Sequence, residues 1–462
     1  MVVFTIFISP SISISQDSPP PDTGGRLYFT FISSAYYMDK RWGQGMPWDG
    51  IKRTAEIAHA NGIPVTWLVN ARSAEEGKDL FTEYHEKFGD EVGHIISVNK
   101  PEADRWGSEA FYLKKLSYKK LGEWIAADHN TIVKNLPWAK LLLGGAGYRS
   151  DKMVRVLEKL GYQGLWGHCW EQTLTDDISD RGAPWGFYYA DSEIFKRPAR
   201  ASGGLVAVEW TARDLNLAFR TGRPETFSTD PNDVQRAGIC DRRNIEYWKR
   251  FVGQYARNTK YNAVVPLAVH QEAHEMECSS RICSNSEETI ESTAQMLDEL
   301  FKYVKTTGAK IVTANEAIQA YRAANLSTPP TYALFDDVYK GENPPVLVYY
   351  DTNGQLFFEK GKIEPLLIRN YMENTDTEST EFASVPEMPA IDCRETAPGA
   401  WTCSITSPAR LPCGLAFWGS WKEIAAASDS AANISTRILP GELAFVSFVA
   451  EKGANEIIVS LK

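Results

Sequence analysis

The sequence lacks three features that point to common classes of protein. Basic residues are not in excess, because 49 Lys and Arg stand against 59 Asp and Glu, and the formal net charge is −10. An acidic chain of this kind is a poor general binder of nucleic acid or anionic membrane. There is no C-x-x-C pair, which argues against a zinc ribbon. No stretch is apolar over the roughly 18 residues that a transmembrane helix needs. We therefore expect no nucleic-acid and no membrane partner, and the oligomeric state stays open.

What is present is ordinary for a globular protein, with 43% hydrophobic and 23% charged residues. The 462 residues exceed the roughly 250–300 that one hydrophobic core usually serves, so we expect two domains.

Residues 1–25 are predicted to be a signal-like segment and a linker. Residues 2–8 form a short apolar run that resembles the core of a secretory signal, although no Lys or Arg precedes it. The alternative is a frayed or mis-started N-terminus. Three consecutive prolines at 19–21 indicate a stiff, exposed linker.

Export would place the protein outside the cell or in the periplasm, where disulfides form. The pairs Cys278–Cys283 and Cys393–Cys403 are then plausible disulfides. Seven cysteines leave at least one thiol free.

Short β-rich runs alternate with amphipathic helical stretches from residue 26 to residue 325. The predicted strands are Leu27–Ile32, Val65–Asn70, His94–Val98, Leu141–Gly144, Gly164–Gly167, Leu205–Trp210, Ala263–His270 and Lys310–Thr313. Apolar residues recur at helical spacing in Ser286–Thr307, at Ile290, Met296, Leu297, Leu300, Phe301 and Val304. This alternation favours a parallel (β/α)7–8 barrel for the catalytic domain, residues 26–325. A doubly wound open sheet is the alternative, but no Gly-rich dinucleotide loop follows the first strand.

The pattern changes after Asn325, where two prolines follow a helical stretch. Beyond them, short alternating runs are separated by turns such as Asn353-Gly354. The predicted strands are Val346–Tyr350, Gln355–Phe358, Ile363–Ile368, Ala400–Ile405, Leu415–Trp418, Ile434–Leu439, Glu442–Ala450 and Glu456–Leu461. We predict an all-β sandwich over residues 333–462.

The reactive groups of a β/α barrel come from the C-terminal ends of its strands. Polar and aromatic side chains follow several predicted strands, and the sequence VVPLAVHQEAHE runs from an apolar strand directly into His270 and Glu272. Glycosidic hydrolysis needs one carboxylic acid and one carboxylate, and Glu171 with Glu272 would supply them across the barrel mouth. The predicted catalytic residues are Glu171, Glu272, His168, His270, Glu209 and Asp214. The predicted substrate-binding residues are Trp170, Trp210, Arg149, Arg213, Asn70, Trp42 and Trp48.

Two other interpretations of the strand end at His270 stay open. His270 and His274 are four residues apart and would share one helix face, as a metal pair does, but a firm third ligand is missing. His270 could also be a satisfied residue of the barrel mouth, and Glu171 could form a structural ion pair with an arginine.

Several stretches carry a resemblance to known proteins. RLYFTFISS, GIPVTWLVN, GYRSDKMVRVLEKLGYQGLW and PLAVHQ resemble the glycoside hydrolase/deacetylase β/α-barrel superfamily over residues 26–322. The whole chain is also similar to uncharacterised barrel-plus-sandwich proteins from carbohydrate-degrading bacteria. In the metal-dependent deacetylases the first strand ends in paired Asp, and a second motif carries two His four apart. Here those positions hold Ser33-Ser34 and a single His94, so the ligands and the base of those enzymes are missing.

We therefore predict a secreted glycoside hydrolase that acts on an oligo- or polysaccharide, with no cofactor and no metal. The alternatives are a metal-dependent, polysaccharide deacetylase-like hydrolase and a non-catalytic carbohydrate-binding protein. The sugar, the linkage and the stereochemical outcome are not specified by the sequence.

Overall fold

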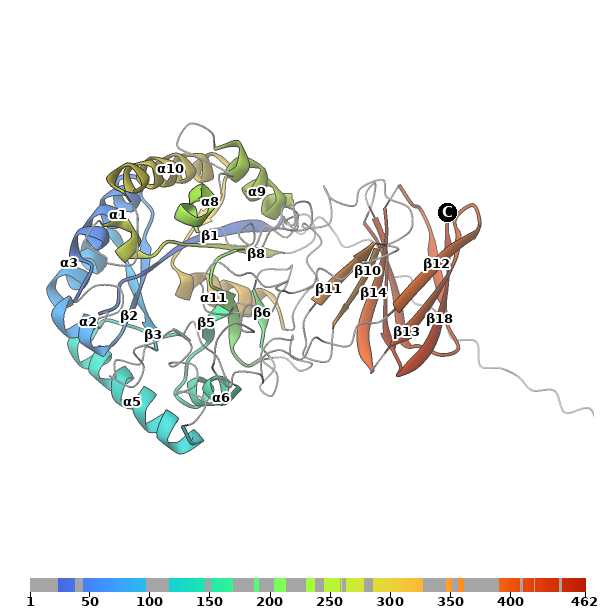
Figure 1. Ribbon diagram of the computed structural model, residues 1–462, viewed down its shortest axis with the longest axis horizontal. Coiled ribbons are helices and arrows are strands. Elements are labelled where there is room, and N and C mark those ends of the chain that lie inside the picture. The colour runs from blue at the N-terminus through green and yellow to red at the C-terminus, as the bar shows by residue number, and fades with distance from the viewer. Residues whose placement is uncertain are drawn as a thin grey trace, which may run out of the picture.

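The computed structural model shows an α/β part followed by an all-β part (Figure 1). It describes residues 24–37, 45–96, 116–145, 151–168, 187–190, 203–212, 230–236, 245–257, 259, 263–277, 286–326, 346–350, 356–360, 390–407, 410–418, 420–439 and 443–462. Among the described helices, none is both long enough and apolar enough to cross a membrane.

The α/β part is built on one nine-stranded sheet, ordered β6-β7-β5-β4-β3-β2-β1-β8, with β9 paired to β1. All its pairs are parallel except that between β6 and β7. The strands are β1 (Arg26–Ser34), β2 (Val65–Val69), β3 (Glu91–Ile95), β4 (Leu143–Gly145), β5 (Gly164–His168), β6 (Tyr188–Tyr189), β7 (Val206–Glu209), β8 (Val264–His270) and β9 (Lys310–Ile311).

The sheet curls, and its two ends meet beyond β7. There the backbone N–H of Ala212 donates to the carbonyl of Ala268 in β8, at 2.8 Å. The predicted parallel β/α barrel is thus confirmed as a curled, partly closed sheet. The described residues join its ends by a hydrogen bond and not by a complete strand ladder.

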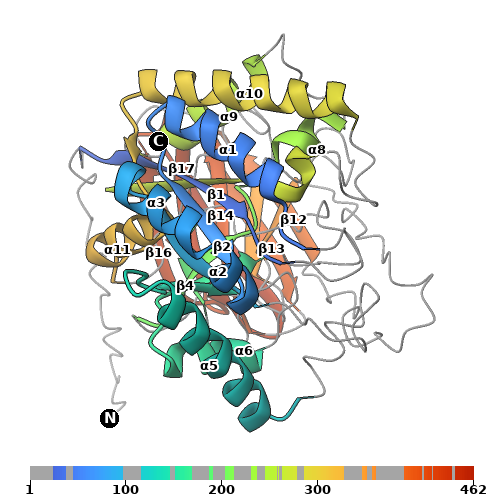
Figure 2. The ribbon, with the colours of Figure 1, turned by 90° about the vertical axis from the view of Figure 1, so that its left-hand side faces the viewer.

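Helices surround the outside of this sheet. Figure 2 shows α10 along one side, α5 along the opposite side, and α1, α2 and α3 between them. The helices are α1 (Trp48–Ala60), α2 (Ala71–Glu76), α3 (Lys78–Phe88), α5 (Tyr118–Asn135), α6 (Asp151–Lys159), α8 (Pro231–Arg236), α9 (Glu246–Arg257), α10 (Glu287–Thr306) and α11 (Ala314–Ala324), with the 3₁₀ helix η4 (Ala273–Met276) after β8. The six apolar positions predicted for α10 are all buried.

Two hydrophobic clusters follow from the alternation of side chains along the strands. One lies between the sheet and the helices, and the other fills the interior of the curled sheet. The interior cluster includes Ile32, Leu68, Ile95, Leu143, Trp166, Val208 and Ala268.

Helix α11 covers the end of the barrel where the strands start. The N–H of Ala314 donates to Thr66 Oγ1 at 2.9 Å, and Asn315 Nδ2 donates to the carbonyl of Lys140 at 2.9 Å. The opposite end, at the C-termini of the strands, is where the functional site of a β/α barrel is expected.

The all-β part contains a five-stranded sheet, β11-β10-β14-β17-β16, and a four-stranded sheet, β12-β13-β18-β15. The strands are β10 (Val346–Tyr350), β11 (Leu356–Lys360), β12 (Ala390–Ala397), β13 (Ala400–Ser407), β14 (Leu411–Trp418), β15 (Ile424–Ala427), β16 (Ala432–Leu439), β17 (Leu443–Ala450) and β18 (Gly453–Leu461). One cluster joins side chains of both sheets, among them Trp401, Ile405, Phe417, Val446 and Val459, as in a sandwich.

The predicted sandwich strands differ from the observed ones at three places. The predicted strand Ile363–Ile368 lies outside the described residues, and β12 and β15 were not predicted. Cys393 and Cys403, one of the two predicted pairs, are joined by a disulfide across β12 and β13. The other pair, Cys278–Cys283, lies outside the described residues.

Candidate active site

The tips of β1 and β8 lie side by side at the C-terminal end of the barrel, because the two strands pair in register from Arg26 to Ile32, which aligns Ile32 with His270. The N–H of Gln271 continues this pairing to the carbonyl of Ile32 at 3.1 Å, and Ser33 Oγ donates to the carbonyl of Gln271 at 2.8 Å. Two segments separated by more than 230 residues therefore share one rigid edge.

A chain of hydrogen bonds runs through three buried side chains at this edge. Ser34 Oγ lies 2.8 Å from His270 Nε2, and His270 Nδ1 lies 3.0 Å from Asp230 Oδ2. Ser34 is 1% exposed, His270 0% and Asp230 2%. Ser34 and His270 alternate with Phe31 and Val269 of the outer cluster, so both side chains are directed toward the interior. This order of hydroxyl, imidazole and carboxylate can activate an alcohol as a nucleophile.

Residues after β7 hold this chain in place. Trp210 Nε1 donates to Asp230 Oδ2 at 2.9 Å, and the N–H of His270 donates to Thr211 Oγ1 at 3.3 Å. The rings of Trp210 and Trp166 lie 4.9 and 5.3 Å from the His270 ring, centre to centre. The imidazole is therefore fixed in orientation between two indoles and a carboxylate.

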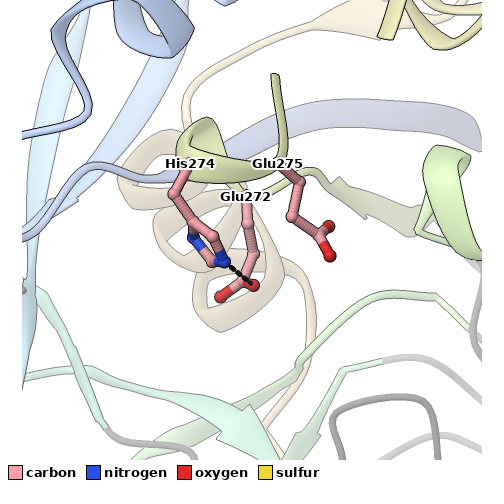
Figure 3. Close-up of side chains that lie close together, drawn as sticks. All are labelled: Glu272, His274 and Glu275. Carbon is pink, nitrogen blue, oxygen red and sulfur yellow. Dashed lines mark ion pairs between the residues drawn. The ribbon is translucent and has the colours of Figure 1, made fainter. Parts of the chain in front are cut away.

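A second polar cluster comes from η4, directly after β8. Figure 3 shows that His274 and Glu272 point toward one another and that Glu275 lies beside them, with its carboxylate to one side of that pair. His274 Nε2 lies 3.3 Å from Glu272 Oε2. Glu275 Oε2 accepts hydrogen bonds from Asn232 Nδ2 and, at 3.3 Å, from Gln271 Nε2.

The position of η4 depends on close packing against α1. A Cβ atom at Gly50 would lie 1.8 Å from the carbonyl oxygen of Ala273, so only glycine fits there. The N–H of Gly50 also donates to Glu277 Oε2 at 3.0 Å.

The residues at the deacetylase metal positions do not fit a metal. Ser33 and Ser34 are engaged with Gln271 and His270. His94 alternates with Ile95 of the interior cluster and is directed outward, where its Nε2 lies 2.8 Å from Asp128 Oδ2 of α5. The predicted strand His94–Val98 is observed as Glu91–Ile95, three residues earlier, because β3 pairs with β2 from Glu91 opposite Thr66 to His94 opposite Val69.

His94 belongs to a separate buried network. Its Nδ1 lies 2.7 Å from the hydroxyl of Tyr162, and His129 Nδ1 lies 2.9 Å from the same hydroxyl. Burial raises the pKa of Tyr162, and the charge of Asp128 adds to this effect. Burial also lowers the pKa of His129, with a further contribution from His94.

Among the predicted site residues, His270 and Trp210 meet at one place, the hydrogen-bonded chain described above. Glu272 lies in the η4 cluster. Glu209 alternates with Val208 and Trp210 of the interior cluster, which places its side chain on the outer side of the sheet, where it is 3% exposed.

Asn70 is the N-cap of α2, where it accepts from the N–H of Ser73, and its Nδ2 donates to the carbonyl of Tyr37. Trp48 begins α1 and is half-buried. His168 ends β5, and its side chain is not described. The other predicted site residues lie outside the described residues: Glu171, Asp214, Trp170, Arg149, Arg213 and Trp42.

The sequence interpretation missed Ser34 as a nucleophile and Asp230 altogether. Ser34 was treated only as a lost metal ligand. The signal available in the sequence was a serine at one strand end and a histidine at another, but their pairing depends on the three-dimensional register. Asp230 stands immediately before Pro231, a common start of a helix, and nothing in that pattern marks a catalytic carboxylate.

Comparison with known proteins gives only a loose structural likeness. No family model and no curated protein matches the chain. Puue allantoinase matches with a TM-score of 0.43 and 11% identity, over 70% of this chain and 100% of that one. A protein assigned as a polysaccharide deacetylase from Mycobacterium smegmatis has a TM-score of 0.41 and 15% identity, over 69% and 98%. Another from Pseudomonas aeruginosa PAO1 has a TM-score of 0.42 and 9% identity, over 66% and 95%.

The predicted resemblance to the glycoside hydrolase/deacetylase superfamily is confirmed at this loose level. Two of the three proteins are named deacetylases, and none is named a glycosidase. Because the TM-scores are low, the chemistry must be argued from the residues of this chain alone.

Proposed function

We propose that this protein is a serine hydrolase that cleaves acyl bonds, with Ser34 as the nucleophile, His270 as the general base and acid, and Asp230 as the carboxylate that orients the imidazole. The observation that supports this most directly is the unbroken chain of contacts, 2.8 Å from Ser34 Oγ to His270 Nε2 and 3.0 Å from His270 Nδ1 to Asp230 Oδ2. This arrangement recurs on unrelated folds, so it is recognised by its geometry and not by the fold that carries it.

The reaction follows from the positions of the protons. Ser34 Oγ attacks the acyl carbon while its proton passes to His270 Nε2, and Asp230 stabilises the imidazolium that forms. His270 then gives this proton to the leaving alcohol or amine, and the acyl group remains on Ser34. Water attacks the acyl carbon of the acyl-enzyme and loses a proton to Nε2. His270 passes this proton to Ser34 Oγ as the bond between Oγ and the acyl carbon breaks, which releases the carboxylic acid and the free serine.

The surroundings of these residues support the proposal. All three side chains are buried, and in such a low-dielectric site a fixed carboxylate acts more strongly on the imidazole than it would in water. The indole N–H of Trp166 is also buried and has no acceptor among the residues that the structure describes, while its ring lies next to His270. It is a donor that could serve the oxygen of the tetrahedral intermediate.

The proposed substrate is an acylated oligo- or polysaccharide, which makes the protein a deacetylase-like hydrolase without the metal of that family. The resemblance of RLYFTFISS and PLAVHQ to deacetylase strands supports this choice.

Glycosidic cleavage, our first prediction from the sequence, has less support. It needs two carboxyl groups across one mouth, roughly 5–9.5 Å apart. Glu171 and Asp214 lie outside the described residues, Glu209 is on the outer side of the sheet, and Glu272 is paired with His274.

The test is hydrolysis of acyl substrates by the full chain. Acetylated glycan oligomers and simple acyl esters should release acid with the parent protein and not with Ser34→Ala. Ser33→Ala is the matched control and should leave turnover largely intact, because among the described residues the hydroxyl of this neighbouring serine donates to a backbone carbonyl and not to His270. Glycan binding without any release of acid, equal in the parent and Ser34→Ala, would instead support a carbohydrate-binding protein.

We also propose that the protein is exported. The disulfide between Cys393 and Cys403 supports this, because such bonds persist in oxidising compartments. Fractionation of expressing cells should recover the chain outside the cytoplasm, and exclusive recovery in the cytoplasm would contradict the proposal.

A further inference from the structure

We infer that Glu272, His274 and Glu275 form a binding site for one divalent transition-metal ion of the zinc or manganese class. One ligand atom from each of the three side chains lies within 4.8 Å of the others. All three residues are more than nine-tenths buried, with exposed fractions of 4%, 3% and 8%. The site is distinct from the deacetylase metal positions, which are Ser33, Ser34 and the motif around His94.

The spacing of these atoms matches a metal site. Bonds of about 2.0–2.2 Å to a tetrahedral ion hold neighbouring ligand atoms roughly 3.3–3.6 Å apart. His274 Nε2 and Glu272 Oε2 are already 3.3 Å apart. One ligand atom of Glu275 lies within 4.8 Å of one from each of the other two residues, and it would have to move toward them to reach the same ion.

The types of side chain narrow the choice of ion. One imidazole with two carboxylates suits zinc or manganese, whereas calcium and magnesium prefer oxygen ligands alone.

Neighbouring residues orient the ligands in the way that outer-shell groups do at metal sites. Asn232 Nδ2 and Gln271 Nε2 both donate to Glu275 Oε2. The turn that carries the ligands is fixed by α1, because Gly50 contacts Ala273 and bonds Glu277. The ligand atoms therefore start from a largely preformed arrangement.

Such an ion would connect the two segments that also carry the serine-histidine chain. Asn232 follows Asp230 by two residues, its N–H donates to Gln271 Oε1 at 3.2 Å, and Gln271 directly follows His270. The role assigned here is positional, and no step of acyl transfer passes through the ion. The inference stands or falls independently of the proposed hydrolase.

The experiment is metal binding by the full chain, stripped with a chelator and titrated with Zn²⁺ or Mn²⁺ in a calorimeter. We expect close to one ion per chain and a higher melting temperature with metal. His274→Gln and Glu275→Gln should weaken binding by at least about tenfold. His129→Gln, a change in another partly buried histidine, should bind as the parent does.

A second measurement uses only the parent and does not depend on folding of the variants. Added Zn²⁺ should slow amide hydrogen exchange in the peptide that spans residues 270–277. The inference is overturned if the parent shows no saturable binding, if the variants bind as tightly as the parent, or if the protection appears elsewhere in the chain.

Discussion

Two buried histidine-carboxylate pairs lie at the ends of strands in the same sheet, and they differ in what stands beyond the imidazole. His270 at the tip of β8 pairs with Asp230 at 3.0 Å and bonds the hydroxyl of Ser34. His94 in β3 pairs with Asp128 at 2.8 Å and bonds the hydroxyl of Tyr162.

The two pairs face opposite sides of the sheet. His270 is directed toward the interior of the barrel, at the end where the strands finish, whereas His94 is directed against α5. Burial further disfavours the charged form of Tyr162 by raising its pKa. A hydrogen-bonded imidazole and carboxylate do not by themselves make a catalytic site. Whether such a pair can act in catalysis depends on the face of the sheet to which the imidazole is directed and on the third group that it bonds.

The largest difference between the two pairs is expected when each histidine is replaced in turn. His270→Gln should lower kcat by about 10³-fold or more, because the proton acceptor of Ser34 is lost. His94→Gln should keep turnover within about tenfold of the parent and should lower thermal stability instead. Steady-state kinetics and thermal melts of both variants are the measurement. Equal losses of kcat would contradict the distinction between the two pairs.

Replacing the carboxylate partner of each histidine tests the same difference. Asp230→Asn should lower kcat by about 10²- to 10⁴-fold, because the amide favours the wrong tautomer of His270. Asp128→Asn is the matched control and should leave kcat nearly unchanged. If Asp230→Asn turns over like the parent, Asp230 is not the orienting group.

Tyr162 tests the structural character of the outer network. Tyr162→Phe leaves a buried nitrogen of His94 and a partly buried nitrogen of His129 without their shared partner and should lower the free energy of unfolding by about 1–3 kcal/mol. Tyr118→Phe, an exposed tyrosine on α5, should change it by less than about 0.5 kcal/mol. Denaturant unfolding of both variants is the check, and a similar small effect would show that the network contributes little.

The smallest expected effect is on the pH dependence of thermal stability. Burial lowers the pKa of His129 in the folded chain, so the unfolded chain binds this proton at a higher pH. Its contribution to stability is therefore fully present above the ordinary histidine pKa and is lost as pH falls from that value through the lowered pKa of the folded chain. The melting temperature of the parent should drop more between about pH 7.5 and pH 5.5 than that of His129→Gln. An equal drop in both would assign the pH dependence to other groups.

The fold could be predicted further than the site. The spacing of apolar residues in α10 marked its buried face, because helical periodicity is a local property of the sequence. The alternation in β18 marked its inner face in the same way. The outward direction of His94 could not be known, because the register of β3 against β2 and β4 decides which of its side chains point outward.

The chain of hydrogen bonds through Ser34 and His270 could not be predicted from the sequence, for a different reason. Ser34 and His270 are 236 residues apart and meet only because β1 and β8 are neighbours in the curled sheet. Asp230 joins them from the start of α8, a short helix that carries no motif. The position of His270 at a strand end could be predicted, because reactive groups of β/α barrels lie there. Its partners could not, because they depend on long-range strand pairing.

Covalent labelling tests the central claim most directly. A fluorophosphonate reacts with an activated serine by forming a phosphorus-oxygen bond and releasing fluoride. Peptide mass spectrometry of the treated parent should find one adduct, on Ser34, and the adduct should be absent from His270→Gln. An adduct on Ser33, labelling that persists in His270→Gln, or no labelling at all would contradict the assignment of Ser34 as the nucleophile.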